Sequence, residues 1–394
     1  MQLIINTYGS SVRRKGERFL IKNGEKQVDF SAHKVQTIVI ATGTHFSSNA
    51  IQLACQHNID VVFLDKRGDP TARVWQTKMG STAAIRRRQL EVSDTSEAIV
   101  FVREWTISKL SNQLNFLSEL RQRRPNEAKH FESPIRTIED ARSKVNRLEG
   151  TIEEIRGSLM GLEGSAGRAY FDCLTCLMPE EYRFNGRSRR PAVDPFNSML
   201  NYAYGVLYSL VERSLILAGL DPFVGFLHTD NYNKKSLVFD MIEPFRIIAE
   251  RTTVLIFTGR RAKREFFREV PGGIELAPDG RAYLITELNK RLDRSVRYPV
   301  GGSKSQTQNA NAEASSESES KGPIPSDSAS EETRESSAEQ DESSPKKKKK
   351  AKFRRIKQRV VIQYEAHALA NSLLGRKDIP KVVETKDLWS ENNE

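Results

Sequence analysis

The sequence has little of what a secreted or membrane-spanning protein needs. It has only three cysteines in 394 residues, Cys55, Cys173 and Cys176. Three cysteines cannot form a disulfide framework, which favours a reducing compartment. No apolar run reaches the 18 residues of a membrane span, and the first residues lack the apolar core of a signal peptide. We therefore expect a cytoplasmic protein without a membrane partner.

Large apolar side chains are also scarce. Hydrophobic residues make up 38% of the chain and aromatic residues 8%, so part of the length is not expected to fold. Residues 301–345 carry ten acids and three bases, a local charge of −7, in a segment rich in Ser, Glu, Asn and Gln. Because the whole chain has a charge of +11, the rest of it carries +18. Such a surplus favours a polyanionic partner such as nucleic acid, although a merely basic soluble protein also fits it.

Short β-rich segments separated by turn signals fill residues 1–80. The predicted strands, with one helix at Ser48–His57 among them, are Leu3–Thr7, Arg18–Lys22, Gln27–Phe30, Val35–Ala41, Val61–Leu64 and Ala72–Trp75. This pattern predicts a small antiparallel β domain with one helix packed in it. Residues 85–300 show apolar positions at helical spacing instead and predict a larger, mostly helical domain. We therefore expect an α+β protein.

The helical part contains several recognisable signals. Residues 86–120 and 135–162 are predicted to form long amphipathic helices. Asp194 and Pro195 mark the start of a helix that ends near Gly219. Residues 301–352 are predicted to be a disordered tether, and residues 353–394 to contain a final amphipathic helix that ends at Gly375. The basic run 346–357 fits an import-like signal, a DNA-contacting arm or a solubilising tail.

One stretch combines His228 with two acids that stand three residues apart, Asp240 and Glu243. On a helix these two carboxylates share one face, where they repel unless a cation or a proton lies between them. A histidine close to that face would complete a site for a hard divalent metal. The alternative is a surface histidine beside a helix with ordinary acidic ends. Two carboxylates and an imidazole favour Mg²⁺ or Mn²⁺ over structural zinc.

Glu163 lies in a segment with three glycines within seven positions, Gly161, Gly164 and Gly167. Each glycine inside a helix costs about 1 kcal/mol relative to alanine. Either a neighbouring element approaches closely there, with the carboxylate pointing into the contact, or the segment is a loop or tight helix crossing with an exposed glutamate.

Other chemistry-bearing residues give weaker signals. Cys173 and Cys176 form a single C-x-x-C among apolar neighbours, which indicates a buried helix rather than zinc ligands. The Arg187–Pro191 cluster is either a phosphate clamp or a solvated loop. The remaining histidines lack partners at metal-ligand spacing and are expected to be incidental; they are His33, His45, His57, His130 and His367. No phosphate-binding loop is present in the sequence.

Taken in order, several segments resemble the CRISPR-associated adaptation integrase/endonuclease family ("Cas-one"). The resemblance covers most of residues 1–300 and the helix near 354–375. It rests on residues 33–40 and 59–65 of the β-rich part, and in the helical part on residues 162–164, 194–202 and 225–228. Its strongest element is the segment from Ser236 to Arg246, SLVFDMIEPFR.

The resemblance implies an N-terminal β-sandwich-like domain, a larger all-helical catalytic domain, and pairing as a homodimer. Glu163, His228 and Glu243 match the family's metal ligands, and Asp240 matches its nearby functional acid. The implied activity joins short foreign DNA to a CRISPR repeat array by transesterification, together with a small ferredoxin-like partner protein, and the implied substrates are double-stranded and branched DNA. The acidic 301–345 segment departs from the family's pattern.

Two competing functions fit part of the same sequence. One is a metal-free architectural DNA-binding module, against which the presence of all four site residues argues. The other is a stand-alone nuclease that repairs branched DNA, which would use the same site in another context.

Overall fold

The computed structural model describes residues 2–65, 70–74, 82–93, 95–188, 191–228, 234–300 and 352–376. By its internal contacts the chain divides into a main unit, residues 1–298 and 355–394, and a second unit, residues 299–354. The tether expected at 301–345 and the lysine run that follows it lie outside the described residues. The description below concerns the main unit.

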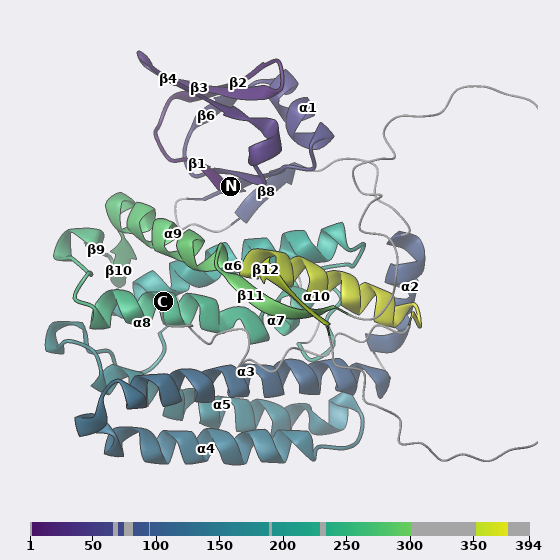
Figure 1. Ribbon diagram of the computed structural model, residues 1–394, viewed down its shortest axis with the longest axis vertical. Helices are drawn as coiled ribbons and strands as arrows, with labels where there is room; N and C mark the ends of the chain where they lie inside the picture. Colours follow the sequence, from purple (N-terminus) through teal and green to yellow (C-terminus); the bar gives the residue numbers. More distant parts are fainter. Residues whose placement is uncertain are drawn as a thin grey trace, which may run out of the picture. The chain divides into compact units, whose positions relative to one another are not determined.

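The N-terminal part consists of two four-stranded sheets (Figure 1). The first has the order β1 (Gln2–Ile5), β5 (Thr37–Ile40), β7 (Asp60–Leu64), β8 (Pro70–Val74). The second has the order β4 (Lys26–Ser31), β3 (Arg18–Asn23), β2 (Ser10–Lys15), β6 (Thr44–Phe46). The short 3-10 helix η1 (Ala32–Lys34) and helix α1 (Ser48–Gln56) connect strands of the two sheets.

Both sheets contain parallel and antiparallel pairs. Strand β5 pairs in parallel with β1 and β7, and β6 pairs in parallel with β2, whereas β8 and the β2–β3–β4 meander pair antiparallel. The expectation of a purely antiparallel domain is therefore wrong. Parallel neighbours need a crossover, and the segment with β6 and α1 supplies the one from β5 to β7.

One apolar core serves both sheets and α1. It includes Leu3, Val12, Phe19, Ile38 and Leu53, all nearly or fully buried. Strands β2 and β6 were not predicted, because β2 reads SSVRRK and buries only Ser10 and Val12. The two-layer arrangement with its own core confirms the predicted β-sandwich-like fold class.

The rest of the main unit is mostly helical. Its helices are α2 (Thr82–Ser93), α3 (Glu97–Gln122), η2 (Pro125–Glu127), α4 (Lys129–Asn146), α5 (Ile152–Cys176), η3 (Glu180–Tyr182), α6 (Pro195–Leu217), α7 (Ser236–Met241), η4 (Glu243–Phe245), α8 (Arg246–Thr258), η5 (Arg264–Phe266), α9 (Pro278–Leu292) and α10 (Gln358–Leu373). A hairpin of β9 (Phe267–Val270) and β10 (Gly273–Leu276) precedes α9, and β11 (Ser295–Val300) pairs with β12 (Lys352–Lys357). This organisation confirms the predicted α+β class with a larger helical domain.

Local signals explain where the helices begin. The single helical run expected over 135–162 is divided into α4 and α5, because Thr151 and Glu154 form a capping box that starts a new helix. Asp194 accepts a hydrogen bond from the backbone N–H of Asn197 at 2.7 Å, with Pro195 in the first turn of α6. The predicted start of α6 is confirmed, as is its end near Gly219, whose φ of +84° suits glycine.

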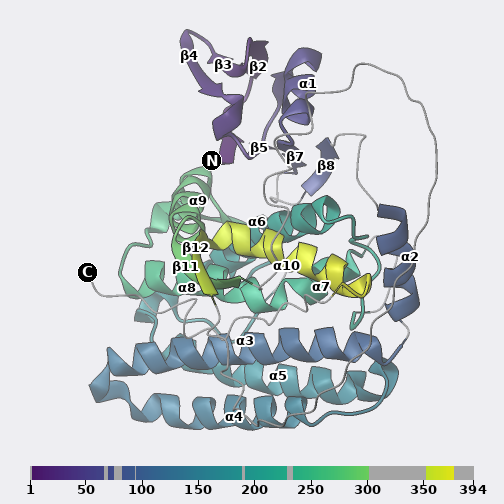
Figure 2. The same cartoon turned by 45° about the vertical axis from the view of Figure 1, so that its right-hand side comes forward.

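Helices α3, α4 and α5 lie side by side as one layer, and α6 and α8 lie in the layer next to it (Figures 1 and 2). Helix α10 packs against α6 through buried residues such as Val361, Ile362 and Leu369, which join the helical core. Helix α10, the last helix among the described residues, is therefore part of the core, although it follows the acidic segment. Residues 352–357, expected to lead into a helix, form strand β12 instead.

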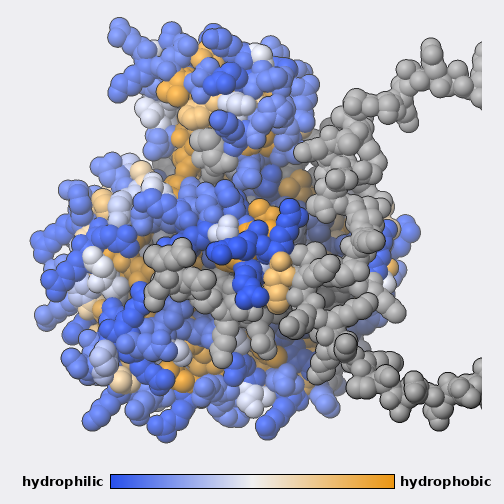
Figure 3. All heavy atoms as spheres, viewed as in Figure 1, coloured by the Kyte–Doolittle hydropathy of each residue, from blue (hydrophilic) through white to orange (hydrophobic). Residues whose placement is uncertain are grey.

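Polar side chains cover most of the face seen in Figure 3, where hydrophobic residues form only small groups. Among the described residues, no helix combines the length and apolarity that crossing a bilayer requires.

Candidate active site

The loop that carries His228 is held against helices α2 and α3. Gln89 of α2 is fully buried, donates hydrogen bonds to the backbone oxygens of Asp221 and Val224, and accepts one from the N–H of Asp221. All three distances lie between 2.8 and 2.9 Å. A buried amide with both ends satisfied fixes the backbone just before His228.

An aromatic stack fixes the same loop from the other side. The Phe226 ring lies parallel to the Trp105 ring of α3, with centroids 6.0 Å apart and planes 3° apart, and it also stacks on Phe101 at 5.7 Å. Phe226 is 2% exposed. Burial of this side chain contributes roughly 1.5–3 kcal/mol to holding the loop.

Gly225 allows the loop to approach α7. A Cβ atom at this position would lie 2.5 Å from the Cβ of Ser236 and 2.9 Å from the backbone oxygen of His228. No side chain fits such a space without displacement of the loop. The glycine is therefore required by the close approach that brings His228 to Asp240.

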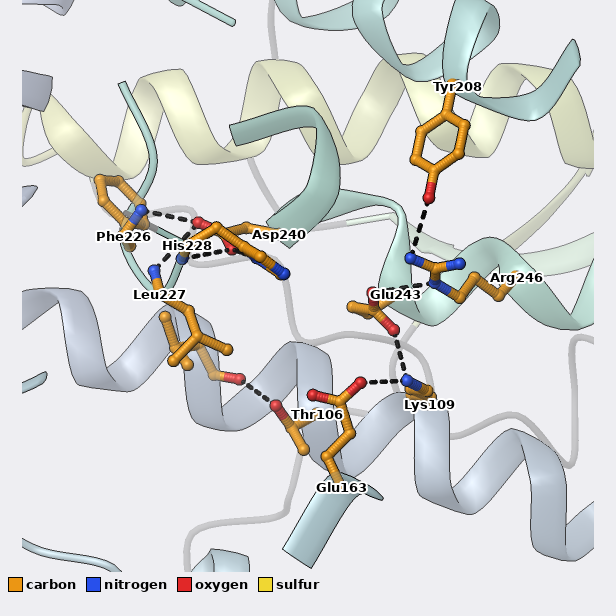
Figure 4. A network of polar contacts seen from close by, with 11 residues as sticks. Thr106, Lys109, Glu163, Tyr208, Phe226, Leu227, His228, Asp240, Glu243 and Arg246 are labelled. Carbon is orange, nitrogen blue, oxygen red and sulfur yellow. Dashed lines mark hydrogen bonds and ion pairs between the residues drawn. The ribbon is translucent and has the colours of Figure 1, made fainter. Parts of the chain in front are cut away.

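Asp240 organises the loop through its buried carboxylate (Figure 4). Its Oδ2 accepts from the N–H groups of Phe226 and Leu227 at 2.6 and 3.0 Å, and its Oδ1 accepts from the N–H of His228 at 3.1 Å. The same Oδ1 is 2.5 Å from Nδ1 of the His228 ring. Because the carboxylate oxygen accepts, Nδ1 supplies the hydrogen of this contact, and Nε2 is the ring nitrogen that remains for a ligand.

A second network joins the two predicted glutamates through a lysine. Nζ of Lys109, on α3, pairs with Oε1 of Glu163, on α5, and lies 2.7 Å from Oε2 of Glu243 in η4. The lysine and Glu243 side chains are only 12% and 8% exposed. One protein cation therefore lies between two carboxylates that come from separate helices.

Arg246 completes this network. Its Nε donates to Oε1 of Glu243 at 2.8 Å, and one of its NH2 groups donates to the Tyr208 hydroxyl at 3.0 Å. Burial alone would raise the pKa of Glu243, but Arg246 and Lys109 outweigh it and hold that pKa well below its usual range. Burial likewise opposes the charge of Lys109, yet Glu243 and Glu163 raise the pKa of its ammonium above the usual value. Lys109, Glu243 and Arg246 are therefore all charged at neutral pH.

The structure brings the four predicted site residues into two adjoining networks rather than one. Asp240 pairs with His228, and Glu163 and Glu243 meet at Lys109 (Figure 4). The carboxylates of Asp240 and Glu243 thus have separate partners, because Asp240 lies in the last turn of α7 while Glu243 begins the 3-10 helix that follows. In this arrangement the ligand atoms of Glu163, His228 and Glu243 do not all lie within 4.8 Å of one another. In the part of the chain that the structure describes, a different set of three side chains meets that distance.

The donor set nevertheless suits a divalent cation. Oε2 of Glu243 is buried, and the ammonium of Lys109 faces it at 2.7 Å, in a position that a metal ion could take instead. Two carboxylates already enclose a positive charge, and the bond from His228 to Asp240 is the outer-sphere arrangement that orients a ligating imidazole. Oxygen-rich sites with one imidazole suit Mg²⁺ or Mn²⁺.

Lys109 and Arg246 were not singled out from the sequence as functional residues. A usable signal was present in α3, where polar residues occupy buried positions near Lys109, namely Thr106, Asn112 and Gln113. Buried polar side chains need partners, and Asn112 donates to the backbone oxygen of Pro244 at 2.8 Å. Polar residues on the apolar face of a helix therefore marked the surface that faces the site.

The other sequence signals have structural explanations. Cys173 is buried and Cys176 exposed near the end of α5, and both thiols are free. Arg187 is not a solvated loop residue, because its guanidinium donates to the side chains of Asn197 and Asn201 on α6, and its role as a phosphate clamp stays a prediction. Arg189 and Arg190 lie outside the described residues. The glycines beside Glu163 lie within α5, and a Cβ atom at any of them would meet open space in the described structure.

The family model described as CRISPR associated protein Cas1 matches residues 3–290. The chain belongs to the Cas1 family. It is 30% identical over 311 residues to the CRISPR-associated endonuclease Cas1 1 of Archaeoglobus fulgidus, covering 76% of this chain and 90% of that protein. It is 29% identical over 296 residues to the CRISPR-associated endonuclease Cas1 2 of Saccharolobus solfataricus, covering 75% and 86%.

Solved structures show the same Cas1 fold. A casposase bound to integration product aligns with a TM-score of 0.73 and 20% identity, covering all of this chain and 96% of that one. A Cas1 protein from Thermotoga maritima aligns with a TM-score of 0.68 and 17% identity over the full length of both chains. At this level of identity the structural likeness concerns the fold alone.

Proposed function

We propose that this Cas1 protein is a divalent-metal-dependent DNA endonuclease and integrase, which inserts short foreign DNA into a CRISPR repeat array by transesterification. The observation that carries the proposal is the convergence of Glu163 and Glu243 on one buried cation, next to a histidine oriented by Asp240. Membership of a family whose curated relatives are named endonucleases supports the same conclusion.

Glu163, His228 and Glu243 would hold Mg²⁺ or Mn²⁺. When bound, the cation would polarise the scissile phosphate and favour ionisation of the attacking DNA 3′-hydroxyl. Lys109 occupies the space between the two carboxylates, so it must withdraw from at least one of them when they bind a metal. The withdrawn ammonium would remain near the reacting phosphate and neutralise part of its charge.

Asp240 acts through His228 in this proposal. Its two oxygens accept hydrogen bonds from three backbone N–H groups and from the imidazole Nδ1–H. Both oxygens are therefore occupied by hydrogen bonds within the protein. We therefore assign Asp240 as a positioning residue, and Glu163, His228 and Glu243 as the groups that touch the reacting complex. This choice follows from the hydrogen bonds, because the sequence left the role of Asp240 open.

The partners are those implied by the family. Double-stranded and branched DNA would be the substrates, the basic surplus of the chain would contact phosphates, and a homodimer would act with a small ferredoxin-like CRISPR adaptation protein in a prokaryotic cytoplasm. One chain of a solved structure described as a Cas6-RT-Cas1–Cas2 complex has a similar fold, and the alignment covers 36% of that chain.

An integration assay tests the proposal. Short DNA duplexes are incubated with a plasmid that carries a repeat array, with Mn²⁺ or EDTA, and with or without the small partner protein. We expect metal-dependent strand joining that the Glu163→Gln and His228→Ala proteins lose. His130→Ala, which changes an exposed histidine of α4, is the matched control and should keep the activity.

Each competing function has its own outcome in this assay. Cleavage of branched DNA without any joining to the repeat array would indicate a stand-alone repair nuclease. Equal DNA binding with Mn²⁺ and EDTA, together with no cleavage or joining in either, would indicate an architectural module. Joining at the wild-type rate by His228→Ala would overturn the assignment of the site.

A further inference from the structure

Three side chains of the β domain gather at one point that the proposed function does not use. They are Glu17 in the β2–β3 turn, His33 in η1 and His57 at the end of α1. Each offers one ligand atom, and these atoms all lie within 4.8 Å of one another. The sequence separates the three residues by 16 and 24 positions, so only the fold brings them together.

The backbone holds all three residues in place. Gly16, with a φ of +58°, permits the tight turn between β2 and β3 that presents Glu17. The backbone oxygen of Glu17 accepts from the N–H of Ala32 at 2.9 Å, which ties the turn to the residue before His33. His57 caps α1 and donates its backbone N–H to the oxygen of Leu53 at 3.2 Å. The cluster is thus built on fixed positions of three elements.

Arg14 orients the carboxylate from behind. Its guanidinium donates to Oε1 of Glu17 at 2.9 Å, to the backbone oxygen of Gly16 at 2.9 Å and to the side chain of Gln56 at 3.3 Å. Oε1 is therefore held by Arg14, and Oε2 is the oxygen that faces the histidines. A second polar group that holds a ligating carboxylate is the usual outer sphere of a metal site.

Glu17 and His57 form an ion pair in which the His33 side chain takes no part. Nε2 of His57 is 2.6 Å from Oε2 of Glu17, and its hydrogen bond and charge lower the pKa of that carboxyl. The His33 ring meets the His57 ring edge to face at a centroid distance of 4.6 Å. Within the described residues His33 makes no hydrogen bond or ion pair of its own. Two imidazoles turned toward one carboxylate are what a shared cation would need.

We propose that Glu17, His33 and His57 form a binding site for a transition-metal ion of the Zn²⁺ class. Two imidazole nitrogens and one carboxylate oxygen match the ligands that Zn²⁺ prefers, and they differ from the oxygen-rich set of the helical domain. The exposed position leaves the remaining coordination to water. The ion would tie the β2–β3 turn, η1 and the end of α1 together and so stabilise the β domain.

Cobalt titration of the full chain tests this site, because tetrahedral or five-coordinate Co²⁺ absorbs visible light more strongly than aqueous Co²⁺. The His228→Ala background weakens uptake at the proposed catalytic site. We expect one equivalent of Co²⁺ with visible bands, displaced by Zn²⁺, and a melting temperature that rises with Zn²⁺ by linkage.

Matched variants decide the outcome. In the same background, His33→Ala/His57→Ala and the milder Glu17→Gln should lose at least about tenfold in Co²⁺ affinity. His45→Ala, which changes an exposed histidine of β6 in the same domain, should keep it. Circular dichroism of the metal-free proteins checks that each variant is folded. Equal Co²⁺ spectra in the double variant and in His45→Ala, or no visible bands in either, would overturn the proposal and leave a hydrogen-bonded His–Glu pair.

Discussion

The helical domain and the β domain each gather carboxylates and histidines, but they neutralise the charges differently. The two carboxylate oxygens of Glu243 face Arg246 and Lys109. The Glu243 side chain is only 8% exposed, and an unpaired charge cannot be buried there. Around Glu17 the side chain is 53% exposed, and water screens what Arg14 and His57 do not neutralise. Burial thus determines how strongly each cluster depends on its own ion pairs.

The largest difference should appear when the acid is removed from the buried cluster. Glu243→Ala leaves Lys109 and Arg246 close together without the anion they share, which should cost about 3–5 kcal/mol of unfolding free energy. Strand joining should also be abolished. Urea unfolding at pH 7 and the integration assay measure the two effects, with Glu269→Ala on exposed strand β9 as the control. A loss below about 1 kcal/mol would show that the buried network is not needed for folding.

Removal of the Lys109 ammonium should destabilise the buried cluster and strengthen its binding of a metal ion. Lys109→Met leaves Glu163 and Glu243 facing each other, so the metal-free protein should lose about 2–4 kcal/mol of stability. The repelling carboxylates should bind a divalent cation at least about tenfold more tightly. Isothermal titration with Mn²⁺ and urea unfolding with EDTA check both results. An unchanged or weaker Mn²⁺ affinity would contradict competition between Lys109 and the metal.

A purely steric change tests whether the histidine loop depends on packing. Gly225→Ala places a methyl group 2.5 Å from the Cβ of Ser236, so it should cost about 1–3 kcal/mol and reduce strand joining. Gly157→Ala in α5 is the matched control, because a methyl group there meets open space and should stabilise the helix by up to about 1 kcal/mol. Similar stabilities of the two variants would argue against close packing at Gly225.

Glu365 is a further buried acid, and a proton rather than a cation neutralises it. Burial raises the pKa of Glu365 on α10 to about 7, although the hydrogen bond from the Tyr298 hydroxyl at 2.8 Å lowers it in part. Because the folded state binds this proton more tightly than the unfolded state, its contribution is present below pH 4.5 and is lost as the pH rises to about 7. Glu365→Gln should therefore be more stable than wild type by about 3 kcal/mol at pH 8, and equal to it at pH 4. Melting curves across that range give the slope; a parallel pH dependence of both proteins would contradict a protonated Glu365.

The smallest effect is expected in the exposed cluster. Glu17→Gln in the metal-free protein should change the unfolding free energy by less than about 1 kcal/mol, since exposed ion pairs contribute little. Urea unfolding with and without 1 M salt, roughly the concentration at which screening acts within 3 Å, provides the check. A larger, salt-independent loss would mean that this cluster supports the β domain without any metal.

The sequence predicts best where one residue type has one strong local effect. Asp194 and Pro195 identify the start of α6, and short β-rich segments between turn signals identify β3, β4 and β7. The sequence also picks out Glu163, His228, Asp240 and Glu243, through their order in a family-like pattern. Their roles as ligands remain predictions.

What the sequence could not supply depends on distant contacts. Lys109 precedes Glu163 by 54 positions, and nothing local indicates that its ammonium lies between two glutamates. His33 and His57 looked incidental for the same reason, since metal-ligand spacing is a local criterion and the two belong to different elements. The mixed sheets were missed because β2 is largely polar and β6 is only three residues long.

The packing of α10 against the rest of the main unit determines what happens when the backbone is cleaved before it. The backbone N–H of Gln358, at the start of α10, donates to the oxygen of Arg294 at 3.0 Å, and Tyr298 binds Glu365. Both ends of the intervening stretch are therefore anchored to the main unit, so that stretch is an insertion between two fixed points and not a terminal extension. A protease cut within residues 301–350 should yield two fragments that stay associated and elute together. Truncation at residue 300, by contrast, would remove α10 and expose the apolar surface of α6 that it covers.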